Sequence, residues 1–138
     1  MQQATYVFDA CSLIALLNRE TGGEEVRQIL RAAARGEVSA IMHKLNLLEV
    51  YYGYIREHGA AFSGKIISHI KKIVTIMPEI DDDIFTEAGR LKAAYKISLA
   101  DAVCLALASV SGGSVVTADH HEFDAVERGE NISFHWIR

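Results

Sequence analysis

The chain has 138 residues, of which half are hydrophobic and 23% are charged, so it fits one globular domain and excludes a disordered or fibrous protein. A domain of this size can bury enough surface to fold without disulfides or a structural metal, so any metal site is expected to serve function. The formal net charge of -4 excludes a strongly basic protein that coats nucleic acid, although a local basic face remains compatible with it.

Hydrophobic spacing predicts strands that alternate with helices along the chain. In chain order the expected elements are a strand at 6–8, a helix at 24–35, a strand at 38–42, helices at 45–55 and 62–73, a strand at 74–77, helices at 84–95 and 98–108, and strands at 114–117 and 132–137. The segment between the last two strands, residues 119–131, is polar and receives no element. This alternation predicts a single α/β domain with a mainly parallel sheet, in which ligands gather at the carboxyl ends of the strands.

The expected location in the cell depends on membrane-spanning and signal segments. No apolar run approaches the roughly 20 residues of a membrane span, and the first residues do not resemble a signal peptide. We therefore expect a cytoplasmic protein with no membrane attachment. Cys11 and Cys104 lie in apolar stretches without CxxC spacing, which predicts buried thiols in place of a disulfide, a zinc site or a nucleophile.

Two aspartates each follow a predicted strand. Asp9 comes after the strand at 6–8, and Asp119 comes after the strand at 114–117. Because the carboxyl ends of parallel strands share one edge of a sheet, we expect both carboxylates at the same site. Asp9 also has a structural interpretation, as the N-cap of a helix that starts at the following residues.

Asp101 and Glu49 lie within predicted helices. Asp101 interrupts an otherwise apolar helix, where an ionised carboxylate must be hydrogen-bonded, paired or metal-bound. Its alternative role is a capping box with Ser98, and the two roles are compatible because one carboxylate has two oxygens. Glu49 flanks the apolar stripe of its helix, which suits either a ligand that faces a cleft or a solvated side chain paired with Arg56.

Several carboxylates in one pocket repel one another and raise their pKa values unless a cation compensates. Asp124, five residues after Asp119, either joins this group or faces water from a turn. Ligation by oxygen alone suits Mg²⁺ or Mn²⁺ better than zinc, and such ions catalyse phosphate-ester hydrolysis. The acidic residues therefore point to phosphodiester chemistry. Residues 81–83 are also acidic, but the start of a predicted helix explains them.

Four short segments form a pattern that is more specific than any one of them. The segments are Val7–Ile14, Leu45–Gly53, Ser98–Ala102, and Val116–Asp119 followed by Phe123. Their order resembles the PIN-domain ribonucleases, and the chain length resembles the VapC-type toxins of bacterial and archaeal toxin–antitoxin pairs. The resemblance covers essentially the whole chain. It implies a PIN-like three-layer α/β/α sandwich around a central, mainly parallel sheet, as a single domain over residues 1–138.

The same resemblance implies Mg²⁺- or Mn²⁺-dependent hydrolysis of RNA by metal-activated water, which leaves 5′-phosphate and 3′-hydroxyl ends. It assigns the catalytic and metal site to Asp9, Glu49, Asp101 and Asp119, with Asp124 as a further metal ligand and with Ser12 and Thr117 as supporting hydroxyls that orient carboxylates or metal-bound waters. It also implies an RNA substrate, a cognate antitoxin and a second copy of this chain as partners.

The sequence departs from the family pattern after Asp119. Many relatives carry another acid two residues later, where this chain has His121, so Glu122 and Asp124 are both eligible as the auxiliary acid. His120 and His121 either contact phosphate or a softer metal such as Mn²⁺, or are solvated loop residues.

Basic and aromatic side chains offer further contacts to RNA. Two sets of basic residues recur at helical spacing and either contact phosphate or form solvated faces: Arg27, Arg31 and Arg35, and Lys65, His69 and Lys72. The tyrosines at 51, 52 and 54 either stack on bases or pack in the core or a dimer.

Two other functions compete with a ribonuclease. A PIN-like domain that binds RNA or protein without cutting would share the same sequence pattern. A phospho-acceptor receiver domain has similar size and architecture, but it requires an acidic pair after the first strand and a lysine after the last. The chain instead has Ala10 and Cys11 after Asp9, and no lysine in residues 132–138.

Overall fold

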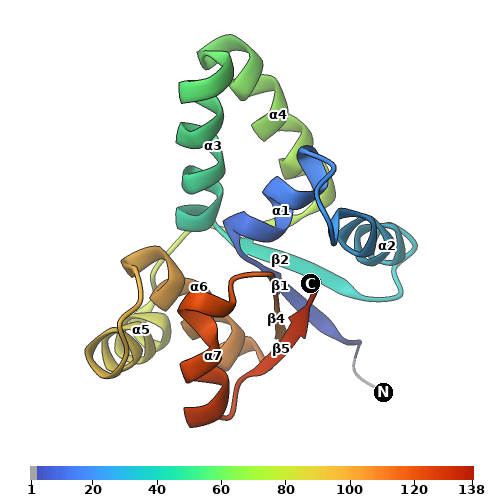
Figure 1. Cartoon of the computed structure of the whole chain (residues 1–138). Coiled ribbons are helices and arrows are strands. Elements are labelled where there is room, and N and C mark those ends of the chain that lie inside the picture. Colours follow the sequence, from blue (N-terminus) through green and yellow to red (C-terminus); the bar gives the residue numbers. More distant parts are fainter. Residues whose placement is uncertain (1–2) are drawn as a thin grey trace.

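The computed structural model describes residues 3–138 and has helices on both faces of a central sheet (Figure 1). Within these residues the sheet has five strands in the order β3-β2-β1-β4-β5, and all neighbouring pairs are parallel. The elements are β1 (Thr5–Phe8), α1 (Ala10–Leu17), α2 (Gly23–Ala34), β2 (Ser39–His43), α3 (Lys44–His58), α4 (Ala60–Ile73), β3 (Thr75–Met77), α5 (Asp82–Ala94), α6 (Leu99–Ser111), β4 (Ser114–Thr117), α7 (His120–Gly129) and β5 (Ser133–Trp136). The predicted three-layer α/β/α architecture is confirmed.

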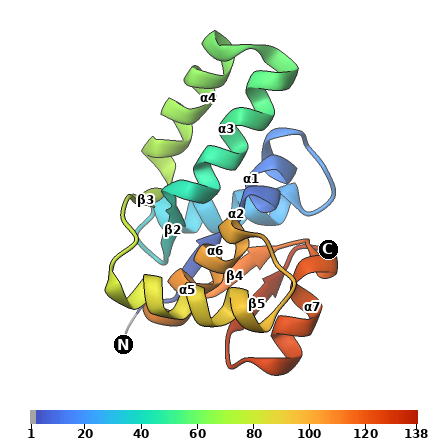
Figure 2. The same cartoon turned by 90° about the vertical axis from the view of Figure 1, so that its left-hand side faces the viewer.

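Alternate residues of the central strands face opposite layers. Val7 of β1 packs into the core formed with α5, α6 and α7, whereas Phe8 packs into the core formed with α1 to α4. Both side chains are fully buried, as expected for a parallel sheet that is covered on both faces. Figure 2 shows α3 and α4 as a hairpin that extends beyond the sheet.

The polar segment after Asp119 differs from the prediction. Residues 119–131 received no element, but the structure forms α7 there. Phe123 and Val126, three residues apart, are fully buried and anchor this short helix on the sheet. Two apolar residues among charged neighbours give a weak periodic signal, so the helix depends on tertiary packing.

Helix α6 lies between the sheet and α5 and is buried over most of its length. It begins at Ser98, whose side chain caps it, and ends at Gly112, which has a φ of 73°. Only glycine adopts this left-handed conformation without strain, so Gly112 stops the helix. No helix within residues 3–138 combines the length and the apolar character needed to cross a membrane.

The cysteines follow the prediction in part. Cys104 is fully buried in α6, whereas Cys11 is only half-buried, and both are free thiols. Burial raises the pKa of the Cys11 thiol to about 11 and that of Cys104 well above its usual value. Neither thiol is therefore activated as a nucleophile.

Candidate active site

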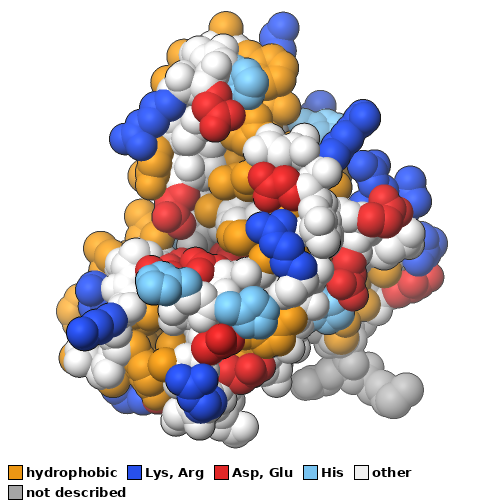
Figure 3. Space-filling model, viewed as in Figure 1, with side chains coloured by type: hydrophobic (Ala, Val, Ile, Leu, Met, Phe, Trp, Pro, Cys, Tyr) orange, Lys and Arg blue, Asp and Glu red, His pale blue; other side chains and the backbone are white. Residues whose placement is uncertain are grey.

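Strand register brings the two strand-end aspartates together. Phe8 of β1 pairs with Val116 of β4, so Asp9 and Asp119 leave the sheet at the same edge. Figure 3 shows acidic side chains gathered in a recess below the α3 arm, with histidine side chains beside them. We use the name acidic site for Asp9, Glu49, Asp101 and Asp119.

Asp9 is held firmly in place. Its carboxylate accepts hydrogen bonds from the backbone N–H of Ser12, at 2.8 Å, and from the hydroxyl of Thr117. The Ser12 hydroxyl in turn donates to the Asp9 carbonyl at 2.9 Å. Asp9 therefore caps α1 and is also tied to β4, so the structural and site interpretations of this residue are compatible. The two hydroxyl residues singled out from the sequence both contact it.

The buried position of Asp9 disfavours its ionised form. Burial raises its pKa from 3.8 to about 6, although hydrogen bonds from Thr117 and Ser12 counter the rise. Repulsion from Asp119 adds to it. A carboxylate that is 2% exposed and faces another carboxylate is costly to ionise without a compensating cation.

Asp119 caps α7 in the way that Asp9 caps α1. Its side chain accepts from the backbone N–H of Glu122 at 3.1 Å, and its own N–H donates to the Thr117 hydroxyl oxygen at 3.0 Å. Thr117 thus contacts both strand-end aspartates. This hydroxyl links the Asp9 carboxylate to the backbone at Asp119.

Glu49 from α3 and Asp101 from α6 complete the acidic site. Burial raises the pKa of Asp101 to about 7, and repulsion from Glu49 and Asp9 adds to the rise, while a hydrogen bond with Ser98 opposes it. Burial also raises the pKa of Glu49, with a further contribution from Asp119. The backbone N–H of Asp101 donates to the Ser98 hydroxyl at 3.1 Å, which is the Ser98 half of the predicted capping box.

Repulsion between carboxylates links all four acids of the site. Asp119 acts on Asp9 and on Glu49, and both of these act on Asp101. Within residues 3–138, none of the four acids forms a salt bridge with a lysine or arginine. Over the same residues, no three His, Cys, Asp or Glu side chains approach closely enough to ligate one ion. The donor chemistry nevertheless fits a hard divalent cation, because the site supplies carboxylate oxygens that form no salt bridge.

The two candidates for an auxiliary acid differ in their surroundings. Glu122 has a buried Oε2 with no hydrogen-bond partner, and it adds to the repulsion that raises the pKa of Asp101. Asp124 instead contacts His120, with Oδ1 2.8 Å from Nδ1. Glu122 therefore belongs electrostatically to the acidic site, and the structure pairs Asp124 with a histidine.

His120 and His121, which follow Asp119, also differ in their surroundings. The Nε2 of His120 lies 2.8 Å from the Arg138 carbonyl oxygen, and its ring stacks on Trp136 with centroids 3.8 Å apart. With Asp124 on the other ring nitrogen, both nitrogens of His120 have protein partners. His121 is exposed.

One residue at the site was missed by sequence reasoning. Asn46 is fully buried, and its Nδ2 donates to the Ala100 carbonyl at 3.1 Å. It precedes Glu49 by three residues, which places it on the same face of α3. A polar residue one turn before a suspected ligand, in an apolar segment, was the available signal.

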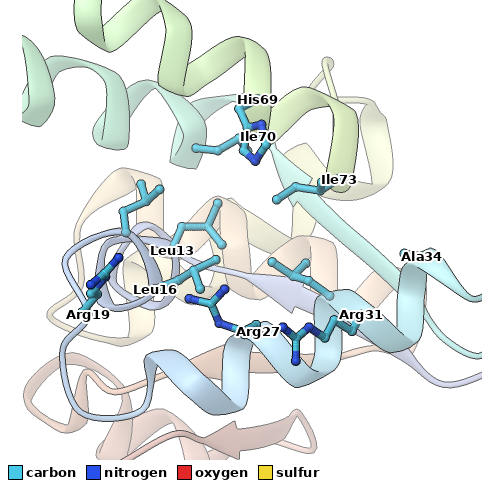
Figure 4. Close-up of a pocket in the computed structure, with 11 residues that line it drawn as sticks. Leu13, Leu16, Arg19, Arg27, Arg31, Ala34, His69, Ile70 and Ile73 are labelled. Carbon is cyan, nitrogen blue, oxygen red and sulfur yellow. The ribbon is translucent and has the colours of Figure 1, made fainter.

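The tyrosines and the basic residues are separated by the fold. Tyr54 is buried and donates to the Asn18 side chain, whereas Tyr52 is exposed and lies beneath the Arg56 guanidinium, 5.1 Å from the ring centroid. Basic side chains from both predicted sets line a groove of about 440 Å³ between α1, α2 and α4 (Figure 4). Its apolar floor includes leucines and isoleucines, and its basic residues are Arg19, Arg27, Arg31 and His69.

The fold and the acidic site together define a class, namely α/β domains with an acidic centre at the carboxyl edge of a parallel sheet. Residues 6–129 match the model of the PIN domain. The chain therefore belongs to the PIN domain family.

Several solved structures share the fold of this chain. The DNA-bound VapBC from Salmonella typhimurium superposes with a TM-score of 0.76 at 16% identity, over 99% of this chain and 100% of that chain. VapBC2 from Rickettsia felis, bound to a promoter DNA fragment, gives 0.74 at 14% identity, over 95% and 97% of the two chains. VapC20 from Mycobacterium tuberculosis, a sarcin–ricin loop cleaving toxin, gives 0.62 at 17% identity, over 87% and 94%. The chain thus has a VapC toxin-like fold. No curated protein matches the sequence.

Proposed function

We propose that this chain is a Mg²⁺- or Mn²⁺-dependent endoribonuclease that acts as the toxin of a toxin–antitoxin pair. The observation that carries the proposal is the convergence of Asp9, Glu49, Asp101 and Asp119 from four separate parts of the chain, with mutual repulsion and, among residues 3–138, no salt bridge to a lysine or arginine. Membership of the PIN domain family supports a nuclease, and the VapC-like fold supports a toxin.

The four residues of the acidic site would hold the ion. Glu122 adds a fifth carboxylate, whose charge acts on Asp101. When bound, a divalent cation would offset the carboxylate charges, polarise the scissile phosphate and lower the pKa of a water molecule. Thr117 and Ser12 keep the Asp9 carboxylate in one orientation. The expected products carry 5′-phosphate and 3′-hydroxyl ends.

The proposed partners are an RNA substrate in the cytoplasm, an antitoxin and a second copy of the chain. The groove between α1, α2 and α4 supports an antitoxin, because its apolar floor and basic rim are complementary to an acidic amphipathic segment. VapBC complexes among the structures of similar fold support the same partner. Sedimentation velocity of the purified chain tests the second copy.

The ribonuclease is tested by incubating the protein with a mixed RNA pool in Mn²⁺, in Mg²⁺ and in EDTA, and by mapping the new ends. Asp9→Asn is expected to abolish cleavage, whereas Asp81→Asn, the same change at the cap of α5, is expected to cut like the wild type. Metal-dependent cuts with 5′-phosphates would support the proposal. RNA that stays intact while the protein binds it would favour a PIN-like domain that binds without cutting.

A further inference from the structure

A single buried amide joins the two helices that supply Glu49 and Asp101. Asn46 has no exposed surface, and its Nδ2 donates to the carbonyl oxygen of Ala100, the residue before Asp101. The same side chain stands one helical turn before Glu49 and lowers the pKa of that carboxyl, in opposition to the effect of burial. Asn46 is therefore bonded to the start of α6 and lies near Glu49 on α3.

The other end of this amide has no partner. Among residues 3–138, the buried side-chain oxygens without a hydrogen-bond partner are Asn46 Oδ1 and Glu122 Oε2. Such atoms are rare in folded proteins because an unmet buried acceptor is costly. Asn46 bonds Ala100, the residue before Asp101, and the charge of Glu122 acts on Asp101. Two unmet acceptors on residues linked to the acidic site indicate a need there for hydrogen-bond donors that the protein does not supply.

We propose that Asn46 is a positioning residue of the acidic site: its Nδ2 fixes α3 against the start of α6, and its Oδ1 accepts a hydrogen bond from ordered water there. The inference rests on the proposed metal site, because hydrated Mg²⁺ and Mn²⁺ retain water molecules that are strong donors. Residues that orient ligands in this way affect metal affinity although they do not ligate the metal.

A purely structural role makes a different prediction. The Ala100 carbonyl lies in the first turn of α6, where the helix supplies a second donor four residues later. Replacing Asn46 with leucine, which has a similar volume, would then remove an unmet acceptor and leave the fold largely intact. A structural tie of the same kind exists elsewhere on α3, where Tyr54 donates to Asn18 of the α1 terminus. Asn18 is exposed, so it provides a control for the loss of one side-chain hydrogen bond to α3, remote from Asp101 in its contacts.

The test is calorimetric titration of the full chain with Mn²⁺, for wild type, Asn46→Leu and Asn18→Leu, after circular dichroism has confirmed folding. Asn46→Leu is expected to weaken Mn²⁺ binding by about 10–100-fold, as is usual for residues that orient metal ligands, while Asn18→Leu stays within about twofold. Asn46→Ser, which is smaller and still polar, is expected to show the same loss because it cannot reach Ala100. It serves as the second variant if Asn46→Leu does not fold.

A double-mutant cycle shows whether Asn46 acts through Glu49. In a Glu49→Gln background, Asn46→Leu is expected to add little to the loss of Mn²⁺ affinity, because the side chain that it positions has already been altered. Unchanged affinity in both Asn46 variants, or an equal loss in Asn18→Leu, would overturn the positioning role. Wild-type protein that binds no Mn²⁺ would instead refute the proposed metal site itself, so the two failures are distinguishable.

Discussion

Replacing Asp9 with asparagine is expected to stabilise the metal-free protein while abolishing cleavage. The change removes a buried charge and keeps the shape of the side chain. The Asn Oδ1 can still accept from the Ser12 N–H, and its amide can donate to the Thr117 hydroxyl oxygen. Asparagine is also as good a helix cap as aspartate, so α1 loses little.

The size of the effect follows from the pKa of Asp9. A rise from 3.8 to about 6 means that ionising this carboxyl costs the folded state about 3 kcal/mol relative to the unfolded state. Rearranging the two hydrogen bonds offsets about 1 kcal/mol of the gain. We therefore expect Asp9→Asn to raise the free energy of unfolding by about 2 kcal/mol at pH 7.5, which corresponds to roughly 6 °C in Tm for a domain of this size.

The pH dependence has a definite sign. Between about pH 4 and pH 6 the folded state retains a proton on Asp9 that the unfolded state has released, so wild-type stability falls as the pH rises. Asp9→Asn lacks this contribution. The difference between variant and wild type should therefore be small at pH 4.5 and reach its full value above pH 7.

Urea unfolding in EDTA, followed by far-UV circular dichroism at pH 4.5 and 7.5, measures both quantities. Asp81→Asn is the control, because Asp81 caps α5 through the Ile84 N–H at 2.9 Å but is exposed. It should change stability by less than about 0.5 kcal/mol at either pH. Two results would refute the argument that burial and repulsion make the Asp9 carboxylate costly to ionise in the folded state. One is an Asp9→Asn variant that is less stable than the wild type at pH 7.5, and the other is an increase in the free energy of unfolding that does not depend on pH.

Four further substitutions test the acidic site and the packing of the helices. Asp101→Asn should weaken Mn²⁺ or Mg²⁺ binding in calorimetry, and identical affinity would leave this residue with a structural role only. Ser98→Ala should lower the free energy of unfolding by about 1 kcal/mol in urea, because it removes the side-chain acceptor at the start of α6. Gly23→Ala should destabilise by about 1–3 kcal/mol, since its Cβ would lie 2.5 Å from the Ala15 carbonyl oxygen. Gly89→Ala, which has open space on α5, should instead stabilise by about 0.5–1 kcal/mol, and equal effects at the two glycines would contradict the clash.

Most of the architecture could be predicted from local sequence. Apolar runs of three to five residues predict the strands, and helical spacing predicts five of the seven helices in residues 3–138, with α2 and α6 as clear examples. Helix α7 is the counterexample, because just two buried residues, Phe123 and Val126, hold it on the sheet. Its stability comes from the strands beneath it, which no local pattern contains.

The sequence by itself determined which carboxylates needed explanation. Asp9 and Asp119 stand where strands end, and Asp101 breaks an apolar helix, so their unusual positions are visible in the order of residues alone. A buried carboxylate needs a hydrogen bond, an ion pair or a metal ion, whatever the details of the packing around it.

Only the tertiary structure decided how these residues are coupled. The register of β1 against β4 places one hydroxyl, that of Thr117, between two aspartates that are 110 positions apart in the numbering. The packing of α3 against α6 gives Asn46 its contact with Ala100, and the path of α7 separates Glu122 from Asp124. These contacts depend on the angles and distances between elements. Side-chain packing across the whole domain sets those angles and distances, and the sequence pattern of one segment does not encode them.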